Sequence, residues 1–318
     1  MVFFVYLDPA LVRAAANAGE LGWSVLAAIL QAAAQNCVVL DFDDYRWQAR
    51  IRSELDACSP VFERSLIKTY LATLATRNRL VPCFKDDDSG RREIDIVAAQ
   101  AEDAELDCLV AATPVTLPKG CCAESTTLAS YLSSRFEQAR SKVAAHGREY
   151  SGGELDSTEF LRVNFRKLLR HASRIEVCDA ILGRKFSDNF KHALERFFNL
   201  IRVDCHAPDG CRVVIHCEGS NRADYLHETV LRLQVNLPPR IQVEVRLYSS
   251  PNGQCLPHER YLWTDQFALE IGRGMDFLDR SSGKNRDVSL NLKDVADVNG
   301  KVASFSRFRS PQQPSIDR

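Results

Sequence analysis

The sequence has almost no net charge, and this lack argues against a ligand that is recognised through a global electrostatic field. Its 41 Lys and Arg residues nearly balance 42 Asp and Glu residues, which gives a formal net charge of −1. A protein that binds nucleic acid or anionic lipid through its overall charge would carry an excess of basic residues. Contact with such a ligand would therefore need a local basic patch.

The sequence also lacks the long apolar segments that secretion or membrane insertion needs. The first residues, MVFFVYLDPALV, have no basic n-region and soon reach Asp8, so they are typical of a first strand and not of a signal peptide. The longest weakly polar stretch, residues 21–40, is interrupted by three amide side chains, which excludes a transmembrane span. We therefore expect a cytoplasmic protein.

The eleven cysteines lack the CxxC pairs that are typical of zinc sites. Their number is odd, and without a secretory signal we expect reduced, mostly buried thiols. Residues 213–217 alternate like a strand, so soft ligands there would point to opposite faces. A zinc site is therefore the less favoured interpretation of the one dense run, which consists of Cys205, His206, Cys211, His216 and Cys217.

Enough apolar residues are present for two folded domains. Hydrophobic side chains make up 45% of the 318 residues, which can offset the entropy of ordering the chain. In the first half, short apolar runs alternate with helical patterns, and this alternation predicts a parallel sheet. The expected strands are residues 2–7, 37–40 and 106–111, and the expected helices are 10–35, 45–57, 60–78, 94–104 and 125–146.

The second half repeats this alternation after a glycine-containing break near residue 150. We expect strands at 174–178, 212–217, 241–248, 259–264 and 267–271, and helices at 156–171, 188–200 and 223–236. The expected fold class is α/β throughout. It comprises an N-terminal Rossmann-like parallel-sheet domain at 1–150, a second α/β domain at 151–300 and a flexible tail at 301–318.

A histidine, a cation and a carboxylate form the most informative pattern of the second half. His258 is followed by Arg260 and Asp265, and the run IGRGMD occupies residues 271–276. Residues i and i+2 of a strand share a face, so the histidine and the cation would act together. A histidine nucleophile, a cation that holds phosphate oxygens and an orienting carboxylate are the groups that phosphoryl transfer uses.

This pattern resembles HxKx4D of the phospholipase D superfamily, with arginine in place of lysine. Residues 160–295, and the run IGRGMDF above all, resemble the C-terminal phospholipase D-like domain of proteins that carry a microtubule-interacting-and-transport (MIT) module. The resemblance implies a nucleophile at His258, a phosphate clamp at Arg260, an orienting carboxylate at Asp265 and no cofactor at this site.

The same resemblance implies further properties of this domain. Phosphate contacts would come from Gly272, Arg273 and Gly274. In the MIT-linked family the superfamily active site is degenerate, and the domain binds membrane phosphoinositides and forms dimers. Only one copy of the pattern is present here, so a homodimer or a larger complex would have to complete a catalytic site.

Carboxylates of the first half form a second constellation. Asp8 and Asp41 end the first two expected strands, and Asp95 precedes a Leu-Asp-x-Leu-Val strand. This arrangement resembles the PIN-like nuclease family, in which such acids hold divalent metal for phosphodiester hydrolysis, with Glu54 or Glu63 as an intermediate acid. The alternative is that these carboxylates cap helices. No glycine-rich turn follows the first strand, which argues against a dinucleotide site.

A local basic patch is expected on the helix at 156–171. Its face either is solvated or contacts a phosphate backbone beside His258 and Arg260. The members of this face are Arg162, Arg166, Lys167 and Arg170.

Two functions remain open from the sequence. The first is a phosphodiester-acting or phosphate-binding protein that acts on nucleic acid in a prokaryotic defence or mobile-element system. The alternative is a non-catalytic adaptor that binds a phosphate group or a protein partner through the same domain.

Overall fold

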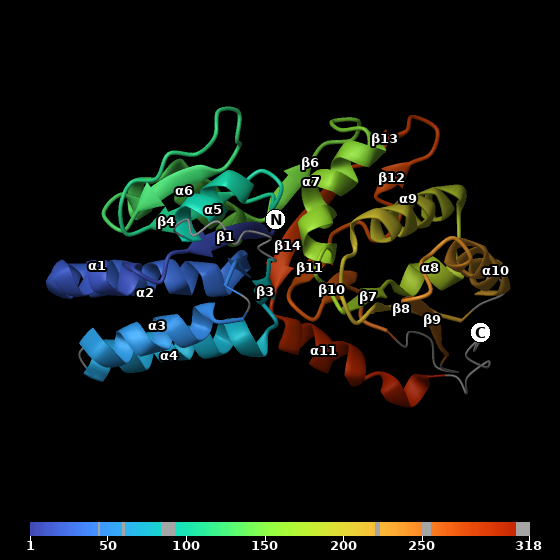
Figure 1. Ribbon diagram of the computed structural model, residues 1–318. Coiled ribbons are helices and arrows are strands. Elements are labelled where there is room, and N and C mark those ends of the chain that lie inside the picture. The colour runs from blue at the N-terminus through green and yellow to red at the C-terminus, as the bar shows by residue number, and fades with distance from the viewer. Residues whose placement is uncertain (44, 59–60, 84–92, 220–222, 250–255, 310–318) are drawn as a thin grey trace. The chain divides into compact units, whose positions relative to one another are not determined.

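The computed structural model describes residues 1–43, 45–58, 61–83, 93–219, 223–249 and 256–309. The chain divides into two compact units, one formed by Val2–Ala145 and the other by His146–Arg318 together with Met1. Each unit contains its own large β-sheet (Figure 1). The division falls slightly before residue 150, because β6 (Arg148–Tyr150) pairs with a strand of the second unit.

A five-stranded parallel sheet forms the centre of the first unit, which confirms the expected Rossmann-like parallel sheet. Its strand order is β3-β2-β1-β4-β5, so the order reverses between β1 and β4. In sheets of this kind, ligands bind outside the carboxyl ends of the strands at such a reversal. The strands are β1 (Phe3–Leu7), β2 (Cys37–Asp41), β3 (Leu80–Pro82), β4 (Cys108–Ala111) and β5 (Glu124–Thr127).

Helices flank this sheet, and α6 lies beside the end of α2, because the Arg140 side chain of α6 donates to Oδ1 of Asn36 at 2.8 Å. The helix expected at residues 10–35 is divided in two, because Gly19 takes a positive φ of 67° between α1 and α2. The helices are α1 (Leu11–Asn17), α2 (Gly19–Asn36), α3 (Trp47–Cys58), α4 (Val61–Thr76), α5 (Glu93–Gln100) and α6 (Arg135–His146).

The expectation of one long helix at residues 125–146 is wrong. The first part is strand β5, which pairs with β4, and the 3-10 helix η1 (Tyr131–Ser133) follows it. Helix α6 begins only at Arg135, because the Ser134 hydroxyl accepts a hydrogen bond from the Glu137 amide at 3.1 Å. The Glu124 carboxylate also accepts from the Phe136 amide at 2.7 Å. These caps fix the start of the helix.

The second unit is built on a mixed seven-stranded sheet. Its order is β6-β14-β11-β10-β7-β8-β9, in which β7, β8 and β9 are parallel and the other pairs are antiparallel. Strands β12 (Leu278–Asp279) and β13 (Lys284–Asn285) form a separate pair. The other strands are β7 (Arg174–Cys178), β8 (Cys211–Glu218), β9 (Ile241–Tyr248), β10 (Tyr261–Thr264), β11 (Ala268–Ile271) and β14 (Val288–Lys293).

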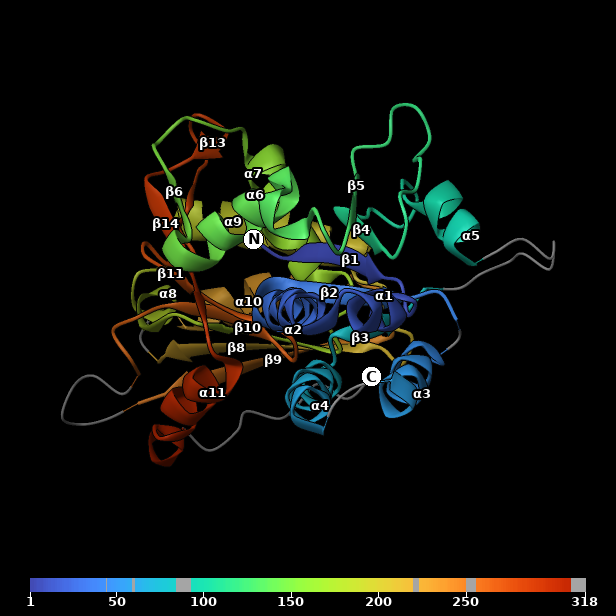
Figure 2. The same cartoon turned by 90° about the vertical axis from the view of Figure 1, so that its left-hand side faces the viewer.

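Helices α7 to α10 lie on one face of the seven-stranded sheet and α11 lies on the other, as Figures 1 and 2 show. Helix α11 packs Val298 and Val302 against Tyr261 and Trp263 of β10. The helices of this unit are α7 (Ser157–Leu169), α8 (Ala180–Arg184), α9 (Asp188–Asp204), α10 (Ala223–Gln234) and α11 (Val295–Ala303).

The segment expected as a flexible tail differs in its first part. Residues 301–309 complete α11, form the 3-10 helix η2 (Ser306–Phe308) and end in a bridge between Arg309 and Tyr248. Residues 310–318 lie outside the described part of the chain. Among the described helices, none combines the length and the apolar character needed to cross a membrane.

Candidate functional site

Side chains of chemical interest gather at one edge of the seven-stranded sheet. Strands β7 and β8 end there, the antiparallel strand β10 begins there, and β11 ends there. We call this region the carboxyl edge and define it by Asp179, Arg184, Glu218, residues 258–260 and residues 271–275. Such an edge is the usual ligand-binding position of open α/β sheets.

Asp179 lies at the centre of the carboxyl edge, directly after β7. Its side chain is buried, and Oδ1 accepts a hydrogen bond from the Ile181 amide at 2.9 Å, which caps α8. Its Oδ2 accepts from the Met275 amide at 2.9 Å. Burial raises the pKa of Asp179, although these two amides and the nearby charge of Arg260 limit the rise. The carboxylate therefore fastens the loop after β11 to the end of β7.

Gly274 separates Asp179 from Arg260. It has a φ of 95°, and a Cβ atom there would lie 2.4 Å from Oδ2 of Asp179 and 3.2 Å from Cγ of Arg260. Only glycine fits this position without strain. The glycine of the IGRGMD run thus lets a cation and a buried carboxylate approach each other.

Arg260 is the one member of the expected catalytic trio that lies against this buried carboxylate. Its side chain is partly buried, and its backbone carbonyl accepts a hydrogen bond from the Ile271 amide at 2.8 Å. Within the part of the chain that the structure describes, the Arg260 guanidinium forms no ion pair and no hydrogen bond. No described residue therefore occupies its N–H donors, which are suited to an anionic ligand.

A second carboxylate and arginine pair occupies the same edge. Glu218, at the end of β8, is buried and accepts a hydrogen bond from the Leu256 amide at 3.2 Å. It also forms an ion pair with the half-exposed guanidinium of Arg184. The sequence prediction missed Asp179 and Glu218 as residues of the site. The signal available was that both carboxylates follow expected strands directly, as Asp8 and Asp41 do.

The structure does not bring His258 and Asp265 together. His258 is exposed just before β10, whereas Asp265 follows the other end of that strand. The four strand residues between them account for roughly 13 Å of rise. Asp265 instead accepts hydrogen bonds from the amide and the hydroxyl of Ser173, at 3.1 and 2.8 Å. The expected role of Asp265, orienting the histidine ring, does not fit this placement.

The amides of the two glycines that were expected to contact phosphate already donate hydrogen bonds within the fold. The Gly272 amide donates to the Ser289 carbonyl at 2.9 Å, and the Gly274 amide donates to the Ile271 carbonyl at 3.2 Å. Both amides are therefore engaged within the fold. Arg273 differs, because its Nε is buried and hydrogen-bonds to no described group, although it lies 3.5 Å from Oδ2 of Asp276.

The basic face of α7 does not lie beside His258 and Arg260. Helix α7 leads into the start of β7, so its last turn lies toward the opposite edge of the sheet. There Arg166 pairs with Asp204 at 2.8 Å, while Arg162 pairs with Glu159 at 2.8 Å. The phosphate-backbone contact expected beside the histidine is thus not formed by this face.

The acidic residues of the first unit are used as caps. Asp8 accepts hydrogen bonds from the amides of Ala10, at 2.9 Å, and Ala112, at 3.3 Å. Asp41 is buried and accepts from the amides of Asp43 and Trp47. Burial raises the pKa of Asp41, and the two amides oppose the rise.

The structure does not gather the expected metal ligands Asp8, Asp41 and Asp95. Asp95 lies in the first turn of α5. Over the described ranges, no group of three or more His, Cys, Asp or Glu side chains is arranged to hold a metal ion. Of the two suggested intermediate acids, Glu54 forms an ion pair with Arg13, and the side chain of Glu63 lies outside the described residues.

An arginine that the sequence prediction missed neutralises two other carboxylates of this unit. Arg50 donates to Asp43 at 2.9 Å and also forms an ion pair with Glu93. The Tyr6 hydroxyl donates to the same Glu93 at 2.8 Å. A guanidinium thus compensates these acids, as a structural ion-pair network does.

The cysteine and histidine run separates as its alternation predicts. His216 points toward Glu176 and Tyr248, with Nε2 2.6 Å from Oε2 of Glu176 and Nδ1 2.8 Å from the tyrosine hydroxyl. Its ring stacks on Trp263 at 5.5 Å between centroids. Burial lowers the pKa of His216, and the hydrogen bond with Glu176 partly opposes this. Both ring nitrogens of this buried histidine have partners, which is typical of a structural cluster.

Comparison with models of known protein families found no match, and comparison with curated proteins found none either.

Proposed function

We propose that the carboxyl edge of the second unit binds a phosphate group of a nucleic acid, with Arg260 as the anchoring cation. The observation that carries this proposal is that Arg260 is partly buried and that its guanidinium forms no ion pair with any described residue. A guanidinium presents a planar set of N–H donors that matches phosphate oxygens.

The neighbouring carboxylate of Asp179 restricts the movement of the Arg260 side chain. Both oxygens of Asp179 already accept backbone N–H donors, so this group is compensated before any ligand arrives. Its position against Gly274 and Arg260 keeps the arginine stem in place. A preorganised cation loses less side-chain entropy on binding than one on a mobile surface chain.

Phosphodiester cleavage is the second candidate, and one observation favours it. His258 is exposed, lies two residues before Arg260 and precedes the same end of β10. A histidine in this position is accessible to a phosphate held by Arg260. Against this candidate, Asp265 is engaged by Ser173 at the opposite end of the strand. The geometry therefore supports binding better than catalysis, which is also what the adaptor hypothesis requires.

Binding is tested with fluorescent oligonucleotides of single- and double-stranded DNA and RNA, and with vesicles that contain phosphoinositides. Arg260→Ala is expected to weaken binding by roughly 10- to 100-fold, because a charge-assisted hydrogen bond contributes about 1.5–3 kcal/mol. Arg232→Ala is the matched control, because this arginine is exposed on α10 and pairs with Glu228 of the same helix. Equal affinities for all three proteins would overturn the proposal.

The same titrations separate the two sources of phosphate. Binding to oligonucleotides but not to vesicles supports a nucleic-acid ligand. Binding to vesicles alone would replace it with a lipid headgroup. Cleavage that continues in EDTA and disappears in His258→Ala would establish phosphodiester cleavage at the carboxyl edge. Cleavage that requires Mg²⁺ or Mn²⁺ would instead indicate a metal-dependent site in the first unit. A role in prokaryotic defence stays a prediction from the sequence.

A further inference from the structure

A groove runs between α7 and α9, and the basic face of α7 forms one of its walls. The two helices lie side by side, because the Phe165 ring contacts the Phe197 ring at 6.3 Å between centroids. The volume of the groove is about 260 Å³, which is less than the roughly 300–1,000 Å³ of typical small-molecule pockets. The groove is therefore suited to side chains of a larger partner and not to a whole small molecule.

Positive charge predominates along this groove. The guanidiniums of Arg162, Arg166 and Arg196 line it. Arg166 pairs with Asp204 at 2.8 Å, so the charge of that carboxylate is compensated inside the groove. Arg162 pairs with Glu159 of its own helix. Arg196 is exposed and forms no ion pair or hydrogen bond with any residue that the structure describes. The three cations therefore exceed the two carboxylates, and an anionic partner can form charge-assisted hydrogen bonds here.

The same groove also contains apolar side chains. Leu161 of α7 is buried, Leu200 of α9 is partly buried, and Val203 is 52% exposed. Leu200 and Val203 are three residues apart, so they form one apolar stripe on α9. A partner with apolar side chains would remove this stripe from water, which is favourable. A phosphate backbone has no apolar group for this purpose, so a polypeptide fits the groove better than a nucleic acid.

We infer that this groove binds an acidic amphipathic helix of a partner protein. Apolar residues of the partner, spaced at three and four positions, cover Leu200 and Val203. Carboxylates beside them face Arg162 and Arg196. Docking of an amphipathic helix in a hydrophobic groove is a recurring mode of peptide recognition. The stretch of α9 from Arg196 to Asp204 rises by roughly 12 Å, so about two turns of the partner helix make the contact.

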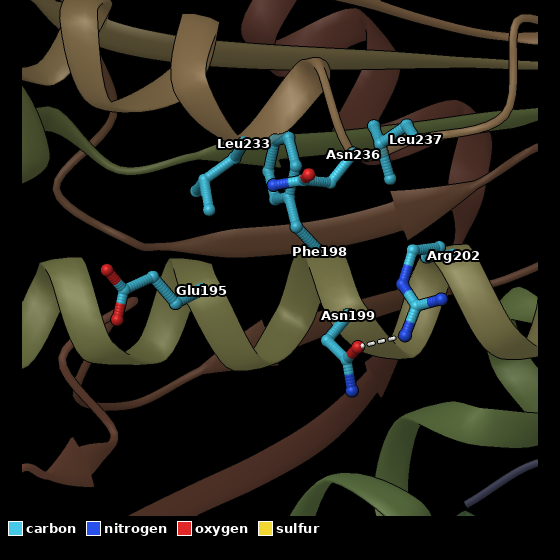
Figure 3. Close-up of a pocket in the computed structure, with 7 residues that line it drawn as sticks. All are labelled: Glu195, Phe198, Asn199, Arg202, Leu233, Asn236 and Leu237. Atoms are coloured by element: carbon cyan, nitrogen blue, oxygen red, sulfur yellow. Dashed lines mark hydrogen bonds between the residues drawn. The ribbon is translucent and has the colours of Figure 1, made fainter.

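The neighbouring groove, between α9 and the end of α10, has a different character (Figure 3). Its Glu195 and Arg202 have opposite charges, and Phe198 at its floor is already buried. Figure 3 also shows that Arg202 donates to Oδ1 of Asn199, at 2.8 Å. The excess of positive charge thus lies on the α7 side of α9. The inference does not rest on the proposed phosphate site, which is formed by the carboxyl edge and not by these helices.

Peptide display on the immobilised full chain tests this inference. The probe is a random library of peptides about 16 residues long, which corresponds to roughly four helical turns. Selected peptides are expected to carry Asp or Glu beside apolar residues at helical spacing. A labelled selected peptide then serves as the ligand in fluorescence anisotropy with the wild type and its variants, after circular dichroism has shown that each variant is folded.

Two variants examine the charged and the apolar part of the groove separately. Arg196→Glu is expected to weaken peptide binding at least about tenfold, because it places a carboxylate against the acidic ligand. Val203→Ser is expected to weaken it by about threefold or more, because less apolar surface is then covered. Arg232→Glu is the matched control, since it makes the same charge change at an exposed arginine of α10. Arg260→Ala should also bind the peptide like the wild type, which separates this groove from the phosphate site.

Several results would overturn the inference. One is a library that yields no binding peptide, or only peptides without acidic residues. Another is an acidic peptide that binds Arg196→Glu as tightly as the wild type, or that loses as much affinity for Arg232→Glu. A single-stranded oligonucleotide that displaces the peptide, and that loses affinity for Arg196→Glu but not for Val203→Ser, would show instead that the groove binds a phosphate backbone.

Discussion

Arg260 and the buried carboxylate of Asp179 both lie against Gly274, because a Cβ atom there would be 3.2 Å from Cγ of Arg260 and 2.4 Å from Oδ2 of Asp179. The three residues come from different parts of the chain and meet because β7, β10 and β11 are neighbours in the sheet. This relationship explains why the loop after β11 contains a glycine with a positive φ. The loop after β11, the Asp179 carboxylate and the Arg260 side chain therefore hold one another in place.

Replacing Gly274 by alanine should destabilise the protein by about 3 kcal/mol. Left-handed backbone strain contributes about 1–2 kcal/mol of this, and overlap of the new Cβ with Asp179 and Arg260 contributes the rest. Urea unfolding followed by circular dichroism measures the change. Gly283→Ala is the matched control, because Gly283 has a φ of 66° but no atom within 4 Å of its Cβ position. A similar loss in both variants would contradict the close approach at Gly274.

Asp179→Asn should change how stability depends on pH. Burial raises the folded-state pKa of Asp179 above its unfolded value, so between the two values the unfolded chain releases a proton that the folded chain keeps. Wild-type stability should therefore fall, relative to the asparagine variant, as the pH rises from about 4. Urea titrations from pH 4 to 7 measure the difference. A difference that grows in the opposite direction would show that ionised Asp179 is favoured in the fold.

Glu244 should show the opposite dependence. Burial of Glu244 acts to raise its pKa, but hydrogen bonds from Arg246 and Arg212 outweigh this and lower the pKa to about 2. The stabilisation from Glu244 is present above the unfolded value of about 4.3 and is lost as the pH falls toward 2. The wild type should therefore lose more stability than Glu244→Gln over this range. Glu228→Gln is the control, because Glu228 is exposed on α10 and should leave the acid dependence unchanged.

Removing the ring of His216 should cost about 3 kcal/mol, because one oxygen of the buried Glu176 carboxylate and the buried Tyr248 hydroxyl lose their hydrogen bonds, although Glu176 keeps its ion pair with Arg174. The hydrogen bonds to Glu176 and Tyr248 are both lost in His216→Ala. His206→Ala is the control, since His206 is exposed and its removal should change the free energy of unfolding by less than about 0.5 kcal/mol. Equal stability of the two variants in urea would show that the His216 cluster contributes nothing.

The regular elements of this fold could be predicted because their signals are local. Strand β8 was expected at residues 212–217, and the alternation of residues 213–217 also predicted that His216 and Cys217 point to opposite faces. The two strands on either side of Asp265 were expected at 259–264 and 267–271 from their apolar residues. The prediction of a helix at 125–146 was wrong because its first part is strand β5. The pairing of β5 with β4 depends on a neighbouring strand and not on local propensity.

The residues of the candidate site could be predicted from the sequence only in part. Spacing alone placed His258, Arg260 and Asp265 in one group, but a strand that runs between them carries the last to the opposite edge. Conversely, Asp179 and Glu218 join Arg260 only through the pairing of β7 with β8 and β10. Sequence spacing cannot show which strand ends are neighbours, because strand order is a property of the tertiary fold.

The most direct test of the central claim is the affinity of Arg260→Ala for a labelled single-stranded oligonucleotide, measured by fluorescence anisotropy beside the wild type and Arg232→Ala. Only the Arg260 variant is expected to lose affinity, by roughly 10- to 100-fold, and circular dichroism is expected to show that it is folded. A folded Arg260→Ala protein that binds as tightly as the wild type would contradict the assignment of the carboxyl edge as a phosphate site.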